Sequence, residues 1–170
     1  SGARVRAASG GQADFDGAAR IGLGGATPSL RAAGTLTIRG GGLPRATLRF
    51  SQEADRIRGT GDVAPYVAGG ATLSISDLAF RRRGSGVAAS AMADFSGGTA
   101  QGRVERLRLP LDVAWKSGAL RVNTQCIDAA FRRLAIGQLV LGPHSLAICP
   151  EGGAMVRVMQ GRLDGGVRMR

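Results

Sequence analysis

The sequence predicts an all-β fold, an antiparallel meander of short amphipathic strands that curls into an open groove or half-barrel with little helix. Apolar residues follow period two far more often than period 3.6. The 28 glycines are spread along all 170 residues without a G-X-Y period, and at roughly twice the average share they argue against long helices. We expect roughly ten to thirteen strands in a single β-rich segment, 1–170, that is part of a longer repeating β-groove protein.

The strands are indicated by alternation of apolar residues with polar or small ones, which buries one face of each strand. In chain order, the clearest segments are 36–38, 48–50, 73–75, 107–111, 113–115, 120–122 and 146–148. Two other segments have helical features, since 87–94 is rich in alanine and Thr124 is a possible cap for 126–134. Glycines end both segments within a few turns, so we predict strands there too.

Turns are indicated by glycine, with Pro44, Pro65, Pro110 and Pro143 nearby. The glycine signals fall at positions 10, 24, 40, 58–61, 69, 84, 97, 118, 142, 152 and 165. Their spacing predicts hairpins along the whole chain.

One apolar spacing, apolar-x-apolar-x-x-apolar-x-apolar, occurs twice at an offset of 61 residues. The copies are Leu73, Ile75, Leu78, Phe80 and Leu134, Ile136, Leu139, Leu141. A three-residue step moves the second pair to the opposite face of a strand unless an extra residue is inserted. We therefore expect β-bulges at 76–77 and 137–138. The copies are either an internal repeat or two ordinary kinked strands.

The stretch 131–141, followed by 146–150, resembles the AsmA-like envelope proteins, and most of all their YdbH branch. The resemblance rests on the L-x-I-x-x-L-x-L rhythm and on short strands joined by Gly-rich turns, and it is best over 103–150. It implies a periplasmic protein of the Gram-negative cell envelope, anchored to the inner membrane through a segment outside this chain. It also implies an open, apolar-lined groove for intermembrane phospholipid transport.

On this resemblance the chain is a non-enzymatic lipid-transfer segment. Its ligands would be phospholipid acyl chains, with envelope proteins as further partners and with membrane contact through other parts of the full protein. Burial of each CH₂ group in an apolar groove would gain about 0.8 kcal/mol. The expected groove lining is Leu73, Ile75, Leu78, Phe80, Leu107, Leu109, Leu111, Leu134, Ile136, Leu139, Leu141, Leu146 and Ile148.

Two alternatives remain open. Strands with one apolar face also fit a closed sandwich or barrel, which periodicity does not separate from a groove. A secreted or surface β-solenoid or adhesin-type structural module would also have short strands and glycine turns. A parallel solenoid should show a steady period of about 20 to 30 residues, and this sequence lacks one.

The two cysteines, Cys126 and Cys149, lie at the ends of the segment with the best resemblance. In an oxidising envelope they would form a disulfide that closes a loop of about 24 residues, worth on the order of 3 kcal/mol. Two separate buried thiols are the alternative. Two cysteines and one histidine without CxxC spacing do not complete a zinc site, so we expect no metal. His144 is expected to be a solvated turn residue.

The chain is strongly basic, with a net charge of +11, and every basic residue except Lys116 is arginine. Such a charge favours anionic ligands, although a GC-rich coding bias produces the same composition. Nucleic acid is disfavoured because only Phe80, Trp115 and Phe131 lie near the arginine clusters to stack bases. Lipid phosphates and plain solvation both remain possible roles for the arginines.

Catalytic motifs are absent from the sequence. There is no G-x-S-x-G elbow, and the stretch 84–89 matches G-x-G-x-x-A without the βαβ context that a dinucleotide site needs. A Cys-His pair would have to use His144. We therefore expect no enzyme activity, no catalytic residues and no cofactor. No uncharged apolar run reaches the roughly 18 residues of a membrane span.

Overall fold

The computed structural model describes residues 2–22, 29–99 and 102–169. Strands make up 79% of the chain, no helix is present in the described part, and the antiparallel meander is not closed into a barrel, which confirms the predicted fold class. The strands are β1 (Gly2–Arg6), β2 (Gly11–Gly22), β3 (Ser29–Gly40), β4 (Leu43–Glu53), β5 (Arg56–Ala68), β6 (Ala71–Arg83), β7 (Gly86–Thr99), β8 (Gly102–Lys116), β9 (Ala119–Val122), β10 (Ile127–Phe131), β11 (Arg133–Ile136), β12 (Leu139–Leu141), β13 (His144–Pro150), β14 (Val156–Met159), β15 (Arg162–Asp164) and β16 (Val167–Met169).

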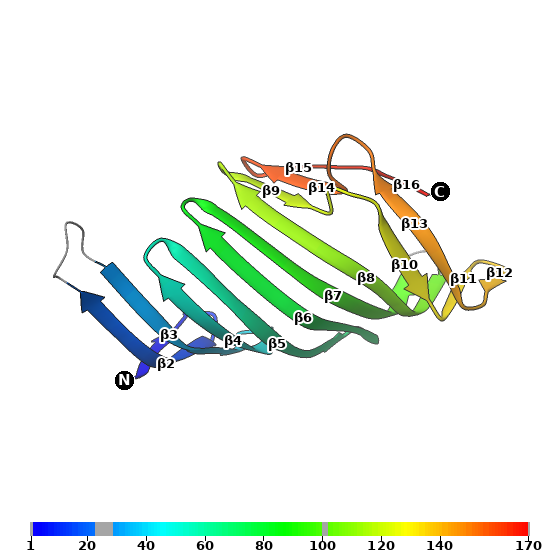
Figure 1. Cartoon of the computed structure of the whole chain (residues 1–170). Coiled ribbons are helices and arrows are strands. Elements are labelled where there is room, and N and C mark those ends of the chain that lie inside the picture. The colour runs from blue at the N-terminus through cyan, green and yellow to red at the C-terminus, as the bar shows by residue number, and fades with distance from the viewer. Residues whose placement is uncertain (1, 23–28, 100–101, 170) are drawn as a thin grey trace.

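The 16 described strands exceed the expected ten to thirteen because the C-terminal part of the chain is divided into short pieces. From β1 to β8, each strand pairs antiparallel with the next (Figure 1). Strand β8 then has three partners in turn: β9 at one end, β10 near the middle and β11 at the other end. Strands β14 and β15 continue from β9, β13 and β16 continue from β10, and β12 pairs with β11.

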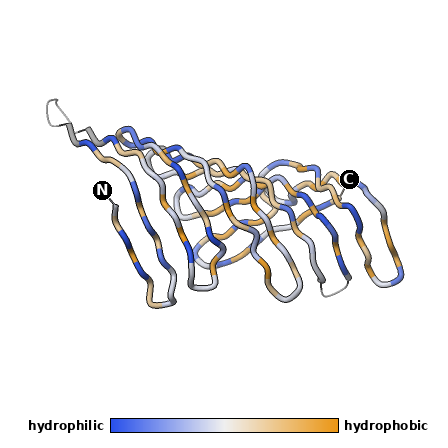
Figure 2. The backbone as a smooth tube through the Cα atoms, turned by 90° about the horizontal axis from the view of Figure 1, so that it is seen from below, coloured by the Kyte–Doolittle hydropathy of each residue, from blue (hydrophilic) through white to orange (hydrophobic). Residues whose placement is uncertain are grey.

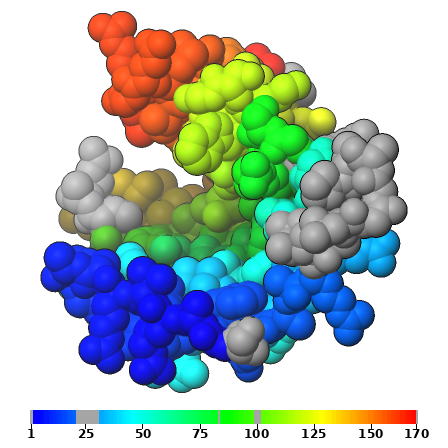
Figure 3. All heavy atoms as spheres, turned by 90° about the vertical axis from the view of Figure 1, so that its left-hand side faces the viewer, coloured from blue at the N-terminus to red at the C-terminus, as the bar shows by residue number. Residues whose placement is uncertain are grey.

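The described chain forms a single curved layer. Among the described strands, every pair in more than marginal backbone contact is a pair of hydrogen-bonded neighbours. Seen from one end, the N-terminal strands lie below and the C-terminal strands above, with a hollow between them (Figure 3). The few buried apolar residues gather mainly where β7, β8, β10 and β13 meet and in the loop before β14, namely Ala93, Val104, Ala129, Phe131, Cys149, Ala154 and Met155.

The ladder register gives the sheet two chemically different faces. Leu36 pairs with Leu48, and Leu48 pairs with Gly61, so these residues share one face, which we call the apolar face. Their neighbours Thr35 and Arg49 pair with each other on the opposite face, which we call the polar face. Figure 2 shows the resulting alternation of hydrophobic and hydrophilic residues along the strands.

Some predicted turns lie inside strands. Turns occur as expected at Gly69, Gly84, Gly118 and Gly152, and position 24 lies outside the described residues. The signals at 58–61 and 97 were wrong, because these residues belong to β5 and β7. A Cβ atom on Gly59 would lie 2.5 Å from Cζ of Phe80. Glycine is therefore needed here to make room for a side chain from the neighbouring strand.

The two copies of the apolar spacing have different structures. The bulge at 76–77 is confirmed, because the register between β6 and β7 shifts between Ser76 and Ala79. The bulge at 137–138 is wrong, because these residues form the turn between β11 and β12. Their hairpin still keeps the apolar side chains on one face, since Ile136 pairs with Leu139. The copies are therefore not a structural repeat. The segments 87–94 and 126–134 contain no helix, as predicted.

Candidate functional site

The thirteen residues of the expected lining lie together on the apolar face. Leu73 is linked through Phe95 to Leu107, and Ile75 is linked in the same way to Leu109 on β8. Across the other side of β8, the pairings with β10, β11 and β13 continue this face to Leu134, Leu146 and Ile148. The register thus brings together side chains from five strands, β6, β8, β11, β12 and β13.

These side chains are neither a buried core nor fully exposed. Four are exposed, Leu73 at 38%, Ile136 at 44%, Leu139 at 56% and Leu141 at 38%. The other nine are half-buried. Because none of the thirteen is buried, the described chain leaves part of the apolar face accessible to an occupant. Their role as a lipid lining stays a prediction.

Phenylalanine rings on the apolar face lie over glycines of neighbouring strands. A Cβ atom on Gly34 would lie 2.5 Å from Cε2 of Phe15, and the Phe15 and Phe50 rings stack at 5.8 Å between centroids. Phe80 lies over Gly59 in the same way. The sequence analysis missed these pairs. The signal for them in the sequence is a glycine with apolar and polar residues that keep alternating on both sides of it, as they do within a strand.

A hollow of about 1150 Å³ lies at one end of β2–β8, near the hairpin turns. It is lined by a complete cross-strand row of the polar face, Ala18, Ala33, Ser51, Arg58, Arg81, Ala88 and Ala114. A row of the apolar face also lines it, namely Ala32, Gln52, Ile57, Arg82, Val87 and Trp115. The row that contains Phe50, Gly59 and Phe80 does not. Residues of both faces therefore border the hollow at this end of the sheet.

None of the thirteen predicted lining residues borders this hollow. A second hollow, of about 510 Å³, is lined by seven residues, of which Leu141 alone belongs to the predicted set. The large hollow was not predicted, because it depends on which polar residues the register places side by side.

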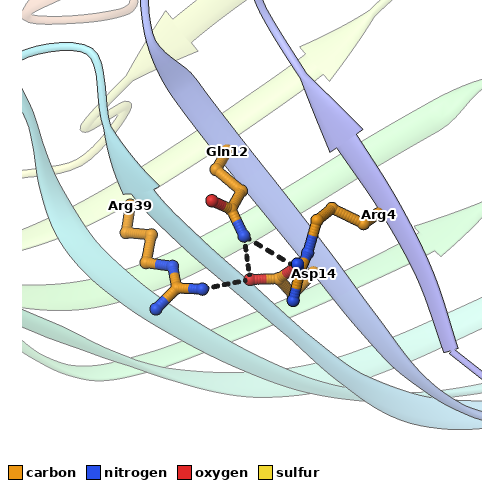
Figure 4. Close-up of polar contacts among 4 residues, drawn as sticks. All are labelled: Arg4, Gln12, Asp14 and Arg39. Carbon is orange, nitrogen blue, oxygen red and sulfur yellow. Dashed lines mark hydrogen bonds and ion pairs between the residues drawn. The ribbon is translucent and has the colours of Figure 1, made fainter.

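A cluster of four polar side chains lies on the polar face near the other end of β1–β3 (Figure 4). Asp14 accepts hydrogen bonds from Arg4, from Gln12 at 2.7 and 2.9 Å and from Arg39 at 2.9 Å. The hydrogen bond from Arg4, followed by that from Gln12, lowers the pKa of Asp14 from 3.8. This cluster joins three strands, and its positive charges are already paired.

Cys126 and Cys149 form a disulfide, as one of the two alternatives predicted. It links the segment before β10 to β13, next to the pairing of Ile127 with Ile148. His144 is exposed as expected, but it begins β13 rather than lying in a turn, and its ring lies 6.4 Å from that of Phe131.

Within 2–22, 29–99 and 102–169, no three His, Cys, Asp or Glu side chains are grouped so that they could bind a metal ion. The same residues include no helix with the length and hydropathy needed to cross a membrane.

Comparison with known proteins gives no relative: no family model, no curated protein and no solved structure matches the chain.

Proposed function

We propose that the apolar face of this open sheet holds phospholipid acyl chains, and that the chain is a non-enzymatic lipid-transfer segment of a bacterial envelope protein. One observation carries the proposal: a continuous apolar face crosses the sheet, and none of its thirteen predicted lining residues is buried within the described chain. Domains ordinarily bury such a face against a second layer. Acyl chains would provide that missing cover.

The chemistry of the face favours flexible apolar ligands. Leucine, isoleucine and valine dominate it, and Phe80 and Phe15 lie over glycines of neighbouring strands. The thirteen residues include no polar side chain that would fix one orientation of a ligand. Each buried CH₂ group would contribute about 0.8 kcal/mol, so affinity would grow with chain length. Such a surface shields acyl chains without recognising one particular lipid.

The proposed location is the periplasm, with attachment to the inner membrane through a segment outside this chain. The resemblance to AsmA-like proteins motivates this location, and the Cys126–Cys149 disulfide supports an oxidising compartment. Envelope proteins are proposed as further partners. They would meet the sheet at its outer strands, where unpaired backbone groups are available.

The topology argues against the alternative of a parallel solenoid. Every pairing described is antiparallel, and β4 is joined to β5, and β6 to β7, by tight hairpins. A parallel solenoid would instead stack one equivalent strand of each repeat on the next.

The test compares two neighbouring residues of β12 that are equally exposed but lie on opposite faces. Leu139 is 56% exposed on the apolar face, and Val140 is 54% exposed on the polar face. Native protein, Leu139→Asp and Val140→Asp are purified from a Gram-negative host, and bound phospholipid is measured by mass spectrometry. Unfolding midpoints are measured alongside.

We expect native protein and Val140→Asp to carry phospholipid and Leu139→Asp to carry much less. Both variants should unfold near the native midpoint, because each carboxylate can reach water and exposed substitutions change stability by about 0.5 kcal/mol or less. Absence of lipid from the native protein would contradict the proposal. So would equal loss of lipid from both variants.

A further inference from the structure

The hollow of about 1150 Å³ near the hairpin turns contains an excess of positive charge. Seven basic side chains line it, against one acidic side chain, Glu53. The basic residues are Arg20, Arg31, Arg56, Arg58, Arg81, Arg82 and Lys116. Glu53 is already paired with Arg31 at 3.3 Å. In the part of the chain that the structure describes, the other six basic side chains form no ion pair.

The register also places like charges directly opposite each other in this hollow. Arg20 pairs with Arg31 across β2 and β3, and Arg58 pairs with Arg81 across β5 and β6. Like charges at directly opposite positions destabilise a sheet. The nearest polar contact of Arg58 is a long one, from its Nε to Oγ of Ser51 at 3.4 Å. An anion between the two guanidinium groups would relieve the repulsion.

Unpaired arginines are not confined to the hollow. Outside it, Arg4 and Arg39 are paired with Asp14, and Arg49 is paired with Asp62 at 2.9 Å, but Arg103 and Arg108 on β8 form no ion pair with any described residue either. What distinguishes the hollow is that seven basic side chains line one concave place, two pairs of them directly opposite each other. Their position therefore points to a ligand.

We propose that this hollow binds a ligand that carries two or more phosphate groups. A guanidinium group donates two parallel hydrogen bonds to phosphate oxygens, and the small residues Ala33, Ala88 and Ala114 beside Arg58 and Arg81 leave space for them. The lining reaches from β2 to β8, about 29 Å at the usual strand spacing. A single phosphate would occupy only a small part of that length.

Nucleic acid fits the hollow less well. Binding of single strands without sequence preference uses aromatic side chains interleaved with the positive charges, so that successive bases stack. Trp115 is the one aromatic residue in the lining. Phosphates without bases, on a soluble oligophosphate or on a lipid headgroup, therefore suit the hollow better. None of the thirteen residues of the proposed acyl-chain surface borders the hollow, so the site does not depend on that surface.

The test follows the fluorescence of Trp115, the single tryptophan of the chain, which lines the hollow and is 56% exposed. Four probes are titrated: inorganic phosphate, tripolyphosphate, phosphatidylcholine vesicles with and without cardiolipin, and a single-stranded oligonucleotide. Tripolyphosphate reports a soluble source of the phosphates. Cardiolipin, a lipid with two phosphates, reports a headgroup source.

Two double variants remove the same charge from different places. Arg58→Gln with Arg81→Gln acts in the hollow, whereas Arg103→Gln with Arg108→Gln acts at exposed positions of β8 outside it. We expect the first to weaken binding of tripolyphosphate or cardiolipin vesicles about tenfold or more, and the second to change it by less than about twofold. Without ligand, the hollow variant should unfold at a higher midpoint than native protein, because the like-charge pair is gone.

The proposal is supported if tripolyphosphate or the cardiolipin vesicles bind more weakly to the hollow variant alone. The probe that does so identifies whether the phosphates come from a soluble ligand or from a lipid headgroup. Equal weakening in both double variants would overturn it, as would absence of binding to both probes. Tighter binding of the oligonucleotide, or a lower unfolding midpoint of the hollow variant without ligand, would also overturn it. The Leu139→Asp variant should bind the phosphate probe normally, which separates this site from the acyl-chain surface.

Discussion

The side-chain oxygen of Asn123 accepts a hydrogen bond from the backbone N–H of Asp112 at 2.7 Å. Its side-chain nitrogen donates to the backbone oxygen of Pro110 at 3.1 Å. Strand β9 stops pairing with β8 at Val113, and β10 pairs with β8 at Arg108. The Asn123 amide thus replaces a ladder partner in the gap between these two strands.

Substitution of Asn123 by alanine should lower the free energy of unfolding by about 1–3 kcal/mol, because two backbone groups lose their partner beside a residue that is 4% exposed. Asn123 also has a φ of 48°, which glycine adopts without strain. Asn123→Gly therefore separates the two causes. Chemical denaturation should show that glycine is also destabilising; full recovery by glycine would mean that backbone strain, and not the amide, sets the cost.

Substitution of Gly59 by alanine should destabilise the sheet by about 1–3 kcal/mol, because the new methyl group would collide with the Phe80 ring and with backbone of β4. Gly142→Ala is the matched control, since a Cβ there meets nothing within 4 Å. Thermal unfolding of the two variants measures the difference. Equal midpoints would show that Phe80 does not lie on Gly59.

Removal of the disulfide by Cys126→Ala with Cys149→Ala should lower the free energy of unfolding by about 3 kcal/mol, because the unfolded chain gains the freedom of a loop of about 24 residues. The measurement is denaturation of the variant beside oxidised and reduced native protein. Oxidised native protein should also show no free thiol after denaturation. Two titratable thiols in protein from an oxidising compartment would contradict the pairing.

The Asp14 cluster predicts a dependence of stability on pH. Because the folded-state pKa of Asp14 is lowered from 3.8, its contribution is present above the unfolded value and is lost as the pH falls through the folded value. Asp14→Asn should therefore be less stable than native protein at about pH 7, and the difference between the two midpoints should shrink as the pH falls below 3.8. Asp62→Asn, which removes one exposed ion pair with Arg49, should cost at most about 1 kcal/mol at neutral pH. A difference between Asp14→Asn and native protein that stays constant with pH would contradict the role of the carboxylate.

Local alternation was enough to predict the strands and the face on which each apolar side chain lies. It failed where a distant neighbour decides the local structure. Gly59 looks like a turn residue in the sequence, yet Phe80 on the next strand makes glycine necessary within a strand. The spacing at 134–141 looks like that at 73–80, but Gly137 and Gln138 turn the chain back instead of forming a bulge.

The large hollow could not be predicted from the sequence for the same reason. Arg58 and Arg81 lie near the open ends of β5 and β6, the two strands of one hairpin. Only the register shows that they are opposite each other. The expected lining could be named because its members alternate within each strand. Periodicity alone did not decide whether the sheet stays open, because it is identical in an open sheet and in a closed one; the open groove was predicted with the help of the resemblance to AsmA-like proteins.

The most direct test of the acyl-chain surface is to map where a lipid tail touches the protein. A phospholipid with a photoreactive diazirine on its acyl chain is bound to the native protein and irradiated, and the adducts are located by mass spectrometry after digestion. Strand β8 is the reference, since Leu107, Leu109 and Leu111 lie on the apolar face and Arg108 on the polar face. We predict adducts on the leucines and not on Arg108. Adducts that are confined to the polar face, or spread evenly over both faces, would contradict the account.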